Sequence, residues 1–583
     1  MAVENSKKVY DFPLFKRVLK YVVPYNNTFY VTTFLAVLLS FLSPLRPILI
    51  QHAFDNYILI PDLNMLQKIT ILLIVLLVLE SIVQFFYTYG ANLLGQSVIR
   101  DLRMQVYNKI LEFKHSYFDK NPIGALVTRV VSDIETVADI FSQGFLIIIG
   151  DILKLLVVVI VMFVTDWRLA LFSLASIPVL IIATNWFKRS IKASFQDVRT
   201  KVSELNTFVQ ERIVGISIVQ LFNRERIESE KFESINKDHM NAHIRSIWYY
   251  SIFFPIVEIL SAVSIGLLIW WGGVSVVNGD EVTLGELIAF ILYIHMLFRP
   301  IRQLADRFNV LQMGMVASER VFKVLDTDSK IKNEGNIAFE TISKSIEFKN
   351  VWFAYNEDDW VLKNVSFELK VGETLAIVGA TGSGKSTIVN ILLRNYEISK
   401  GEIFIDGVPF ENYDLNSLRK NISLVLQDVF LFSDSILNNV TLKEDISLET
   451  VKQCAKELDI DGFISRLPST YNYNVKERGA MLSVGQKQLL SLLRAYVISP
   501  KLLILDEATS SIDSESEVLI QKAINKLTKN RTSIVIAHRL ATIQNASKIM
   551  VLEKGEIIEI GTHQELLSLG NAYKKLFDLQ FKD

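Results

Sequence analysis

A glycine-rich segment at residues 379–387 is the strongest chemical signal in the sequence. It consists of Gly379, Ala380, Thr381, Gly382, Ser383, Gly384, Lys385, Ser386 and Thr387, and it follows the apolar run Thr374–Val378. This is the P-loop pattern of strand, loop and helix, in which backbone N–H groups surround phosphates. Lys385 can reach the β- and γ-phosphates, and Ser386 can ligate Mg²⁺. A chance glycine-rich turn does not explain the complete match, so we predict binding of ATP with Mg²⁺.

Two adjacent acids supply the second signal. Leu502–Leu505 is a run of four apolar residues, and Asp506 and Glu507 follow it. Such a run predicts a buried strand, and open α/β sheets place ligands at the carboxyl ends of their strands. Asp506 can hold Mg²⁺ directly or through water, and Glu507 can polarise an attacking water. Alone this pattern is weak, but it is strong downstream of a P-loop.

The elements that position these residues alternate between strands and helices. Strands are predicted at Ile346–Phe353, Glu373–Val378, Gly401–Ile405, Ile422–Val425, Leu502–Leu505, Ser533–Ile536 and Lys548–Glu553. Helical segments lie between many of them, which predicts an α/β domain with a largely parallel sheet.

The first half of the chain reads as a membrane α-helical bundle of six transmembrane helices. Its apolar stretches are 29–50, 68–94, 138–164, 168–187, 247–277 and 284–298. The fourth is interrupted by Pro178, and the sixth is short, with Arg299 and Pro300 at its end. A span requires about 20 apolar residues, and so many long runs could hardly be covered in one soluble domain. The predicted division is 1–28 as a cytoplasmic N-terminus, 29–317 as the transmembrane domain, 318–345 as a linker and 346–583 as the nucleotide-binding domain.

Basic residues gather before the first stretch and after the second, fourth and sixth, whereas the opposite loops carry acids. This bias predicts that both termini and the ATPase half are cytoplasmic. Asp11–Val23 suits an amphipathic helix along the membrane interface. The single cysteine, Cys454, excludes an internal disulfide, and the net charge of −1 gives no basic surface for nucleic acid.

The loops 95–137 and 188–246 are long and charged but keep helical periodicity. They predict helices that continue well beyond the bilayer; solvated loops are the alternative.

Charges also occur inside the apolar runs. Asp151 and Lys154 can neutralise each other three residues apart, whereas Arg46, Glu80 and Glu258 either line a translocation path or make structural hydrogen bonds.

From these motifs the soluble half resembles the nucleotide-binding domain of ABC transporters. The whole chain, over roughly residues 11–580, looks like an ABC exporter half-transporter of the bacterial multidrug and lipid type. Its most specific motif is Leu482–Gln486, which resembles the ABC signature. The resemblance implies that Ser483, Gly485 and Gln486 act on ATP bound to a second chain. A local helix cap is the alternative interpretation of this motif, but it does not explain the order of the motifs downstream.

The resemblance implies roles for further residues. Tyr355 resembles the aromatic that stacks on adenine, Gln427 the loop glutamine that senses Mg²⁺ and the membrane domain, and His538 the switch histidine at the γ-phosphate. Ser511, Ile512 and Asp513 resemble the loop that couples two ATP sites. Tyr117–Asp119, with Gly124 and Arg129, resembles the first coupling-helix region, and Gln220–Glu225 the approach to the second.

Two positions depart from the family pattern. Val484 replaces a usual glycine within the signature, and Lys476 follows Val475 where a glycine is usual. A β-branched residue restricts the backbone, so Val484 puts the assumption of a homodimer in doubt. A homodimer and a heterodimer with a second half-transporter both remain open.

The resemblance implies ATP-driven export, or flipping between leaflets, of amphipathic small molecules or lipids through the bilayer, in a bacterial inner membrane. An ATP-gated channel or regulatory protein on the same scaffold is the alternative. A soluble ABC ATPase acting on DNA or translation, an importer and a leader-cleaving peptide exporter fit the sequence less well. The sequence does not identify the cargo.

Overall fold

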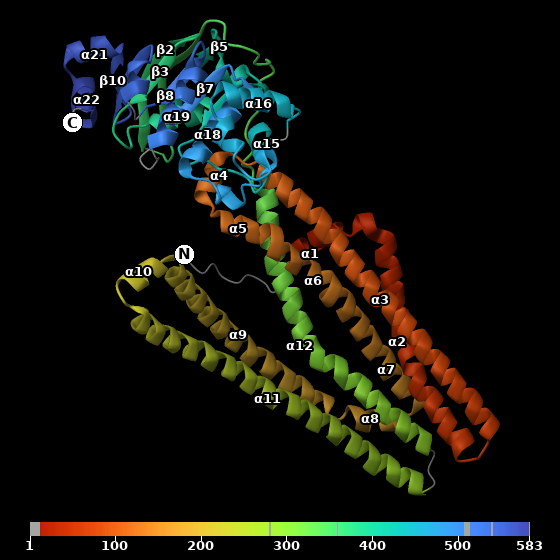
Figure 1. Cartoon of the computed structure of the whole chain (residues 1–583). Coiled ribbons are helices and arrows are strands. Elements are labelled where there is room, and N and C mark those ends of the chain that lie inside the picture. The colour runs from red at the N-terminus through yellow and green to blue at the C-terminus, as the bar shows by residue number, and fades with distance from the viewer. Residues whose placement is uncertain are drawn as a thin grey trace. The chain divides into compact units, whose positions relative to one another are not determined.

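The computed structural model describes residues 12–278, 282–357, 359–442, 444–506, 514–537 and 540–581, which fall into two compact units. The first unit comprises residues up to Leu111 together with Asn121–Asp328, and the second comprises Glu112–Lys120 together with Ser329 onward. The first is helical, and the second combines two sheets with short helices (Figure 1). The chain therefore divides into the two kinds of structure that its hydropathy predicts.

Long helices make up the first unit. In order they are α1 (Phe12–Lys20), η1 (Val23–Tyr25), α2 (Asn26–Ala53), η2 (Phe54–Ile58), α3 (Leu63–Leu111), α5 (Ile123–Thr128), η3 (Arg129–Asp133), α6 (Ile134–Asp139), η4 (Ile140–Phe145), α7 (Leu146–Thr165), α8 (Trp167–Leu174), α9 (Ile177–Val214), α10 (Ile216–Leu221), α11 (Glu225–Asn278) and α12 (Leu284–Asp326). Within the described residues, five helical stretches are long and apolar enough to cross a membrane: Val23–Ile58, Leu63–Leu111, Ile123–Thr165, Trp167–Val214 and Glu225–Asn278.

The charged segments between the apolar stretches are helical. Helix α3 has 49 residues, and at 1.5 Å per residue it is about 73 Å long, more than twice the hydrocarbon core. Helices α9 and α11 run side by side and are joined by α10 (Figure 1). The expectation that these segments are helical is confirmed, and the alternative of irregular loops is wrong. That the helices extend beyond a bilayer stays a prediction.

Helix α12 contains the sixth predicted span. Its first turn is fixed by a capping box, in which the Thr283 hydroxyl accepts from the Glu286 N–H and the Glu286 carboxylate accepts from the Thr283 N–H. Asp55 holds the same turn, because it accepts from the Thr283 hydroxyl at 2.7 Å and the Gly285 N–H at 2.8 Å. The helix continues to Asp326, so the non-helical linker begins at Thr327 rather than at residue 318. Crossing of the membrane by α12 stays a prediction, since its apolar part is short.

Two sheets organise the second unit. A four-stranded antiparallel sheet has the order β2–β1–β4–β5, and a six-stranded sheet has the order β10–β9–β3–β8–β7–β6. In the larger sheet, β9 to β6 are parallel and β10 is antiparallel to β9. The strands are β1 (Ser345–Ala354), β2 (Trp360–Lys370), β3 (Thr374–Val378), β4 (Lys400–Ile405), β5 (Val408–Pro409), β6 (Ile422–Val425), β7 (Leu502–Asp506), β8 (Thr532–Ile536), β9 (Lys548–Glu553) and β10 (Glu556–Gly561). All seven predicted strands are present.

The second unit also contains short helices, most of which lie between these strands. They are α4 (His115–Lys120), α13 (Lys385–Leu392), η5 (Phe410–Asn412), α14 (Leu415–Lys420), α15 (Ile436–Thr441), α16 (Leu448–Glu457), α17 (Asp461–Ile464), η6 (Thr470–Asn472), η7 (Glu477–Gly479), α18 (Val484–Ile498), α19 (Ser514–Thr528), α20 (Leu540–Gln544), α21 (His563–Leu569) and α22 (Ala572–Phe581).

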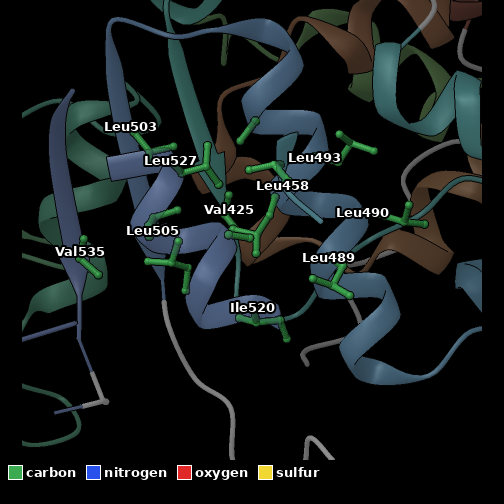
Figure 2. Close-up of a cluster of buried hydrophobic side chains, with 14 of the residues drawn as sticks. Val425, Leu458, Leu489, Leu490, Leu493, Leu503, Leu505, Ile520, Leu527 and Val535 are labelled. Atoms are coloured by element: carbon green, nitrogen blue, oxygen red, sulfur yellow. The ribbon is translucent and has the colours of Figure 1, made fainter. Parts of the chain in front are cut away.

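The apolar side chains of strand β7 are buried on both faces of the larger sheet. Leu503 and Leu505 belong to one apolar cluster, with Leu489 and Leu493 of α18 (Figure 2). Leu502 and Ile504 belong to a second cluster. Successive side chains of a strand point to opposite faces, so a strand that is covered on both faces requires a continuous apolar run. This burial fixes the place of Asp506 at the end of the strand.

Lys476 occupies a strained backbone conformation just before η7. Its φ is 60° and its ψ is −173°, a region that is populated almost only by glycine and costs about 1–3 kcal/mol for other residues. Its side chain is exposed, so little packing offsets this cost. The residue that departs from the family pattern therefore keeps the backbone of a glycine.

We expect Lys476→Gly to stabilise the second unit by about 1 kcal/mol, because relief of strain exceeds the added entropy of the unfolded chain. Thermal unfolding of the purified protein in detergent measures the effect. Lys452→Gly is the matched control, since Lys452 lies inside α16 and glycine there costs about 1 kcal/mol. If Lys476→Gly unfolds at a lower temperature than the unaltered protein, the backbone of Lys476 is not strained.

Candidate nucleotide-binding site

The candidate site lies at one edge of the larger sheet, where four neighbouring parallel strands end. Strands β3, β8, β7 and β6 are adjacent in that order. Ile377 pairs with Ile536, and Ile536 pairs with Asp506. The segments that continue from these strand ends carry the P-loop, Ala537, Asp506 and Gln427. Segments separated by up to 160 residues in the sequence therefore begin at one edge, as the parallel order requires.

The P-loop connects β3 to α13, and its glycines are required for two different reasons. Gly384 caps α13 with a φ of 107°, a conformation that side chains rarely adopt. At Gly379, a Cβ atom would lie 2.1 Å from the carbonyl oxygen of Leu552, so no larger residue fits. The loop is thus held against β9, and α13 begins directly after it at Lys385, so that the positive end of the helix dipole lies next to the loop.

Lys385 is buried within this loop. Its Nζ donates to the carbonyl oxygens of Gly379 at 2.8 Å and Ala380 at 3.0 Å. Burial lowers the pKa of Lys385, and the nearby Asp506 carboxylate opposes this shift. The Ser383 hydroxyl is also buried, and it makes no hydrogen bond within the described part of the chain. A buried cation and an unpaired donor in one loop fit an incoming phosphate group.

The residues predicted for Mg²⁺ are consistent with that ion. Ser386 is exposed in the first turn of α13, Asp506 is half-buried at the end of β7, and Gln427 is exposed after β6. Among the described residues there is no group of three His, Cys, Asp or Glu side chains that could enclose a metal. The serine hydroxyl, the carboxylate and the amide oxygen of Ser386, Asp506 and Gln427 are oxygen ligands, the kind that Mg²⁺ prefers. Glu507, His538 and the coupling loop Ser511–Asp513 lie outside the described residues.

Tyr355 follows β1 and is connected to the P-loop helix. Its hydroxyl lies 3.2 Å from the Thr387 hydroxyl, and its ring remains 40% exposed. The rings of Phe353 and Tyr396 contact it edge-on, with centroids 4.8 and 5.0 Å away. An aromatic side chain that is fixed at two edges and still exposed can stack on a nucleobase.

Tyr396 was not predicted from the sequence, and it connects Tyr355 to α4. Its hydroxyl donates a hydrogen bond to the Asp119 carboxylate, and its ring contacts His115 edge-on at 5.9 Å. Burial, followed by this hydrogen bond, raises the pKa of Tyr396. The predicted coupling segment Tyr117–Asp119 thus packs on the nucleotide-binding domain. The second predicted segment, Gln220–Glu225, spans the turn between α10 and α11.

The signature segment forms the N-terminus of α18. Ser483 caps the helix: its hydroxyl accepts from the Gln486 N–H at 3.2 Å, and the Gln486 side chain accepts from the Ser483 N–H at 3.0 Å. Ser483 is exposed and Gly485 is buried. Val484 is 57% exposed. The local interpretation as a helix cap is therefore correct, and the cap presents a hydroxyl and a helix N-terminus to solvent.

Charged residues inside the membrane half form ion pairs between helices. Arg46 of α2 lies 3.4 Å from Glu80 of α3, which also accepts from the Ser43 hydroxyl at 2.7 Å. Asp151 of α7 lies 3.2 Å from Arg307 of α12. The predicted partner of Asp151 was Lys154, so the main ion pair instead joins two helices. Lys154 interacts electrostatically with Glu80 and Asp151 as well as with Arg46 and Arg299.

The comparisons with known proteins agree with both units. Residues 29–301 match the ABC transporter transmembrane region, and residues 362–510 match the ABC transporter domain.

Relatives match over nearly the full chain. An uncharacterised ABC transporter ATP-binding protein of Bacillus subtilis, YknV, is 37% identical over 99% of this chain and 96% of its own length. An ATP-dependent lipid A-core flippase of Syntrophus aciditrophicus is 33% identical over 98% and 95%. YgaD of Bacillus subtilis, provisionally named a multidrug export ATP-binding/permease protein, is 33% identical over 97% and 99%. The chain therefore belongs to the ABC transporter family, as an ATP-hydrolysing membrane transporter that carries its transmembrane region and its ATPase domain on one polypeptide.

Proposed function

We propose that this chain pairs with a second half-transporter to export amphipathic small molecules or lipids, or to flip them between leaflets, with energy from ATP. The observation that carries the proposal is the convergence of the P-loop, Asp506 and Gln427 at one sheet edge. The described residues of the same chain also contain five helical stretches that are long and apolar enough to cross a membrane. The names of the relatives, lipid A-core flippase and multidrug export protein, support this class of cargo.

Each residue of the site has its own proposed role in ATP binding and hydrolysis. Tyr355 stacks on adenine, and the loop Gly379–Thr387 surrounds the phosphates. Lys385 exchanges its loop carbonyls for phosphate oxygens when ATP enters. Ser386, Asp506 and Gln427 hold Mg²⁺, which neutralises phosphate charge.

The remaining proposed roles fall on residues outside the described part of the chain. Glu507 orients the attacking water, and His538 contacts the γ-phosphate. In the sequence, Glu507 is the first residue after β7 and His538 is the second residue after β8, and both strands end at the edge of the site.

The second chain completes each site through its signature segment. The exposed Ser483 hydroxyl, the Gly485 backbone and Gln486 bind the γ-phosphate of the other chain's ATP. A helix N-terminus stabilises an anion, which suits this role. Val484 places exposed methyl groups on the same turn, where the usual glycine lets both backbone N–H groups approach the phosphate. We propose a homodimer with weakened sites, or a heterodimer in which the partner's signature restores one site.

The distribution of Lys and Arg supports a multi-pass protein of the bacterial inner membrane, with both termini and the ATPase domain cytoplasmic. We place the transmembrane domain at about 29–317 and the nucleotide-binding domain at 346–583.

Charges in the membrane half support a polar route for cargo. The Arg46 side chain is 43% exposed although it pairs with Glu80, and Arg299 is also exposed. Exposure of a charge to lipid is costly, so such groups face water or another protein surface. We therefore propose that Arg46, Glu80 and Lys154 line the translocation path. Glu258 is exposed on α11 and remains a separate candidate.

Tyr396 connects the site to α4, a helix of the same unit. Helix α4 follows α3 in the chain after three residues, and Asp119 of α4 accepts the hydrogen bond of Tyr396. Tyr396 in turn contacts Tyr355. We propose that movement of α4 and occupancy of the adenine site are coupled through this tyrosine.

Glu507→Gln and Lys385→Ala should separate hydrolysis from binding. Loss of the general base should lower ATP turnover by about 100-fold or more and leave ATP binding intact. Loss of the lysine should weaken ATP binding itself, because a buried cation next to the phosphates is removed. Turnover and binding of a fluorescent ATP analogue by the purified variants measure both effects. Normal turnover in Glu507→Gln would remove Glu507 from the mechanism.

Val484→Gly should raise ATP turnover of the purified chain about five-fold. Without the valine side chain, one more backbone N–H of this turn can donate to the γ-phosphate. Such a hydrogen bond lowers the free energy of the transition state by about 1 kcal/mol. Val518→Gly, at another exposed valine, is a control for general effects. If the purified chain hydrolyses no ATP with either Val484 or glycine, a different second subunit is obligatory.

Tyr396→Phe should lower transport per ATP hydrolysed by up to about ten-fold, because one hydrogen bond to a charged acceptor is worth about 1.5 kcal/mol. Dye or lipid movement in proteoliposomes, divided by ATP turnover, gives this ratio. Tyr473→Phe is the control, since this half-buried tyrosine belongs to the same unit but packs on a different apolar cluster. An unchanged ratio in Tyr396→Phe would show that α4 is coupled by other contacts.

A further inference from the structure

A cleft lies between the N-terminal helix α1 and the C-terminal part of α3. It has a volume of about 670 Å³, within the usual range for small-molecule sites. Its lining residues are Pro13, Lys16, Arg17, Lys20, Tyr21, Pro24, Asp101 and Gln105. The walls are held together by a hydrogen bond from the Tyr21 hydroxyl to the Gln105 side chain at 2.9 Å.

Two of the charged lining residues are already paired. Both terminal nitrogens of Arg17 donate to the Asp326 carboxylate at 2.6 Å, and the guanidinium lies 4.2 Å from the centre of the Phe322 ring. Asp101 accepts from the Tyr25 hydroxyl at 2.6 Å and from Arg100 at 3.0 Å. These pairs fix the cleft and cancel the charges of Arg17 and Asp101.

Lys16 and Lys20 are the remaining charges of the cleft. They are four residues apart and therefore on the same face of α1. Both side chains are exposed, and no described carboxylate forms an ion pair with either. The cleft thus carries two positive charges that are not compensated within the described residues.

The position of α1 brings this cleft to a membrane surface. The helix buries Val18 and exposes Phe12. Helix α2, which begins at Asn26, belongs to the next stretch, Val23–Ile58, which is long and apolar enough to cross a membrane. A short amphipathic helix next to a span lies in the headgroup region. Basic clefts beside spans attract anionic lipids, because the cytoplasmic leaflet carries negative charge.

We propose that this cleft binds the phosphate headgroup of an anionic glycerolipid, with Lys16 and Lys20 contacting the phosphate. The tyrosine and proline walls, together with the exposed Phe12, favour a lipid over free phosphate because they offer apolar surface next to the cations. In one respect this rests on the proposed function: α1 must lie at the membrane surface. The bound lipid would also steady the Arg17–Asp326 contact, which holds the last residue of α12 before the linker.

The test measures binding without nucleotide, so that its result does not depend on ATP hydrolysis or transport. The delipidated full-length protein in neutral detergent is titrated with phosphatidylglycerol, and bound lipid is counted by native mass spectrometry. We expect K16A/K20A to weaken the tightest binding event about thirty-fold, since each basic residue near an anionic headgroup contributes about a five-fold effect. K16R/K20R should retain binding.

K188A/K192A removes the same charge from α9, where the two lysines follow the apolar stretch of that helix, and is the matched control. It should bind like the unaltered protein, and neutral phosphatidylcholine should bind weakly to all variants. Unchanged binding by K16A/K20A, or equal loss in K188A/K192A, would overturn the proposal. Displacement of the lipid by an equal concentration of inorganic phosphate would show a site for a free anion instead, and would overturn the assignment to lipid.

Discussion

The order of the parallel strands β3, β8, β7 and β6 is the constraint on which the chemistry of this protein depends. Parallel strands place all their carboxyl ends at one edge, and the paired register sets Asp506 beside Ile536 and Ile536 beside Ile377. The apolar run Leu502–Leu505 is buried on both faces, so β7 cannot slide or tilt without opening two clusters. The precision of the site therefore comes from the sheet core, and the loops only add the reacting groups.

Much of this arrangement could be predicted because it follows from apolar runs and motifs that are continuous in the sequence. All seven predicted strands are confirmed; they are mostly apolar runs with helical segments between many of them. Strands β2, β5 and β10 were missed. In β2 and β10 exposed residues alternate with less exposed ones, so their sequences are mixed rather than continuously apolar. Strand β5 has only two residues. The predicted linker 318–345 begins with residues that are helical in the structure, because Ser318–Asp326 carries charged residues yet continues α12. Charge alone does not distinguish a solvated helix from a linker.

The contacts that were not predicted are those between segments far apart in the chain. Asp151 has a lysine three residues away, yet its ion pair is with Arg307, 156 residues away. Tyr396 belongs to no motif, and its importance follows only from its contacts with Asp119, His115 and Tyr355. Local spacing shows which residues can meet on one helix, whereas helix packing decides which of them do. The roles of Glu507 and His538 remain predictions from motif position.

Both halves of the chain present surfaces that are unfavourable unless something covers them. In the ATPase half, Ser483 and Val484 expose a hydroxyl and an apolar side chain at a helix N-terminus, where the only strong electrostatic attraction is for an anion. In the membrane half, Arg46 keeps 43% of its side chain exposed within a span, where contact with lipid is costly. A second chain can solve both problems, since it brings a nucleotide to the first surface and encloses a water-filled path at the second. The placement of Arg46 in the membrane half therefore supports a second chain in addition to the signature segment of the ATPase half.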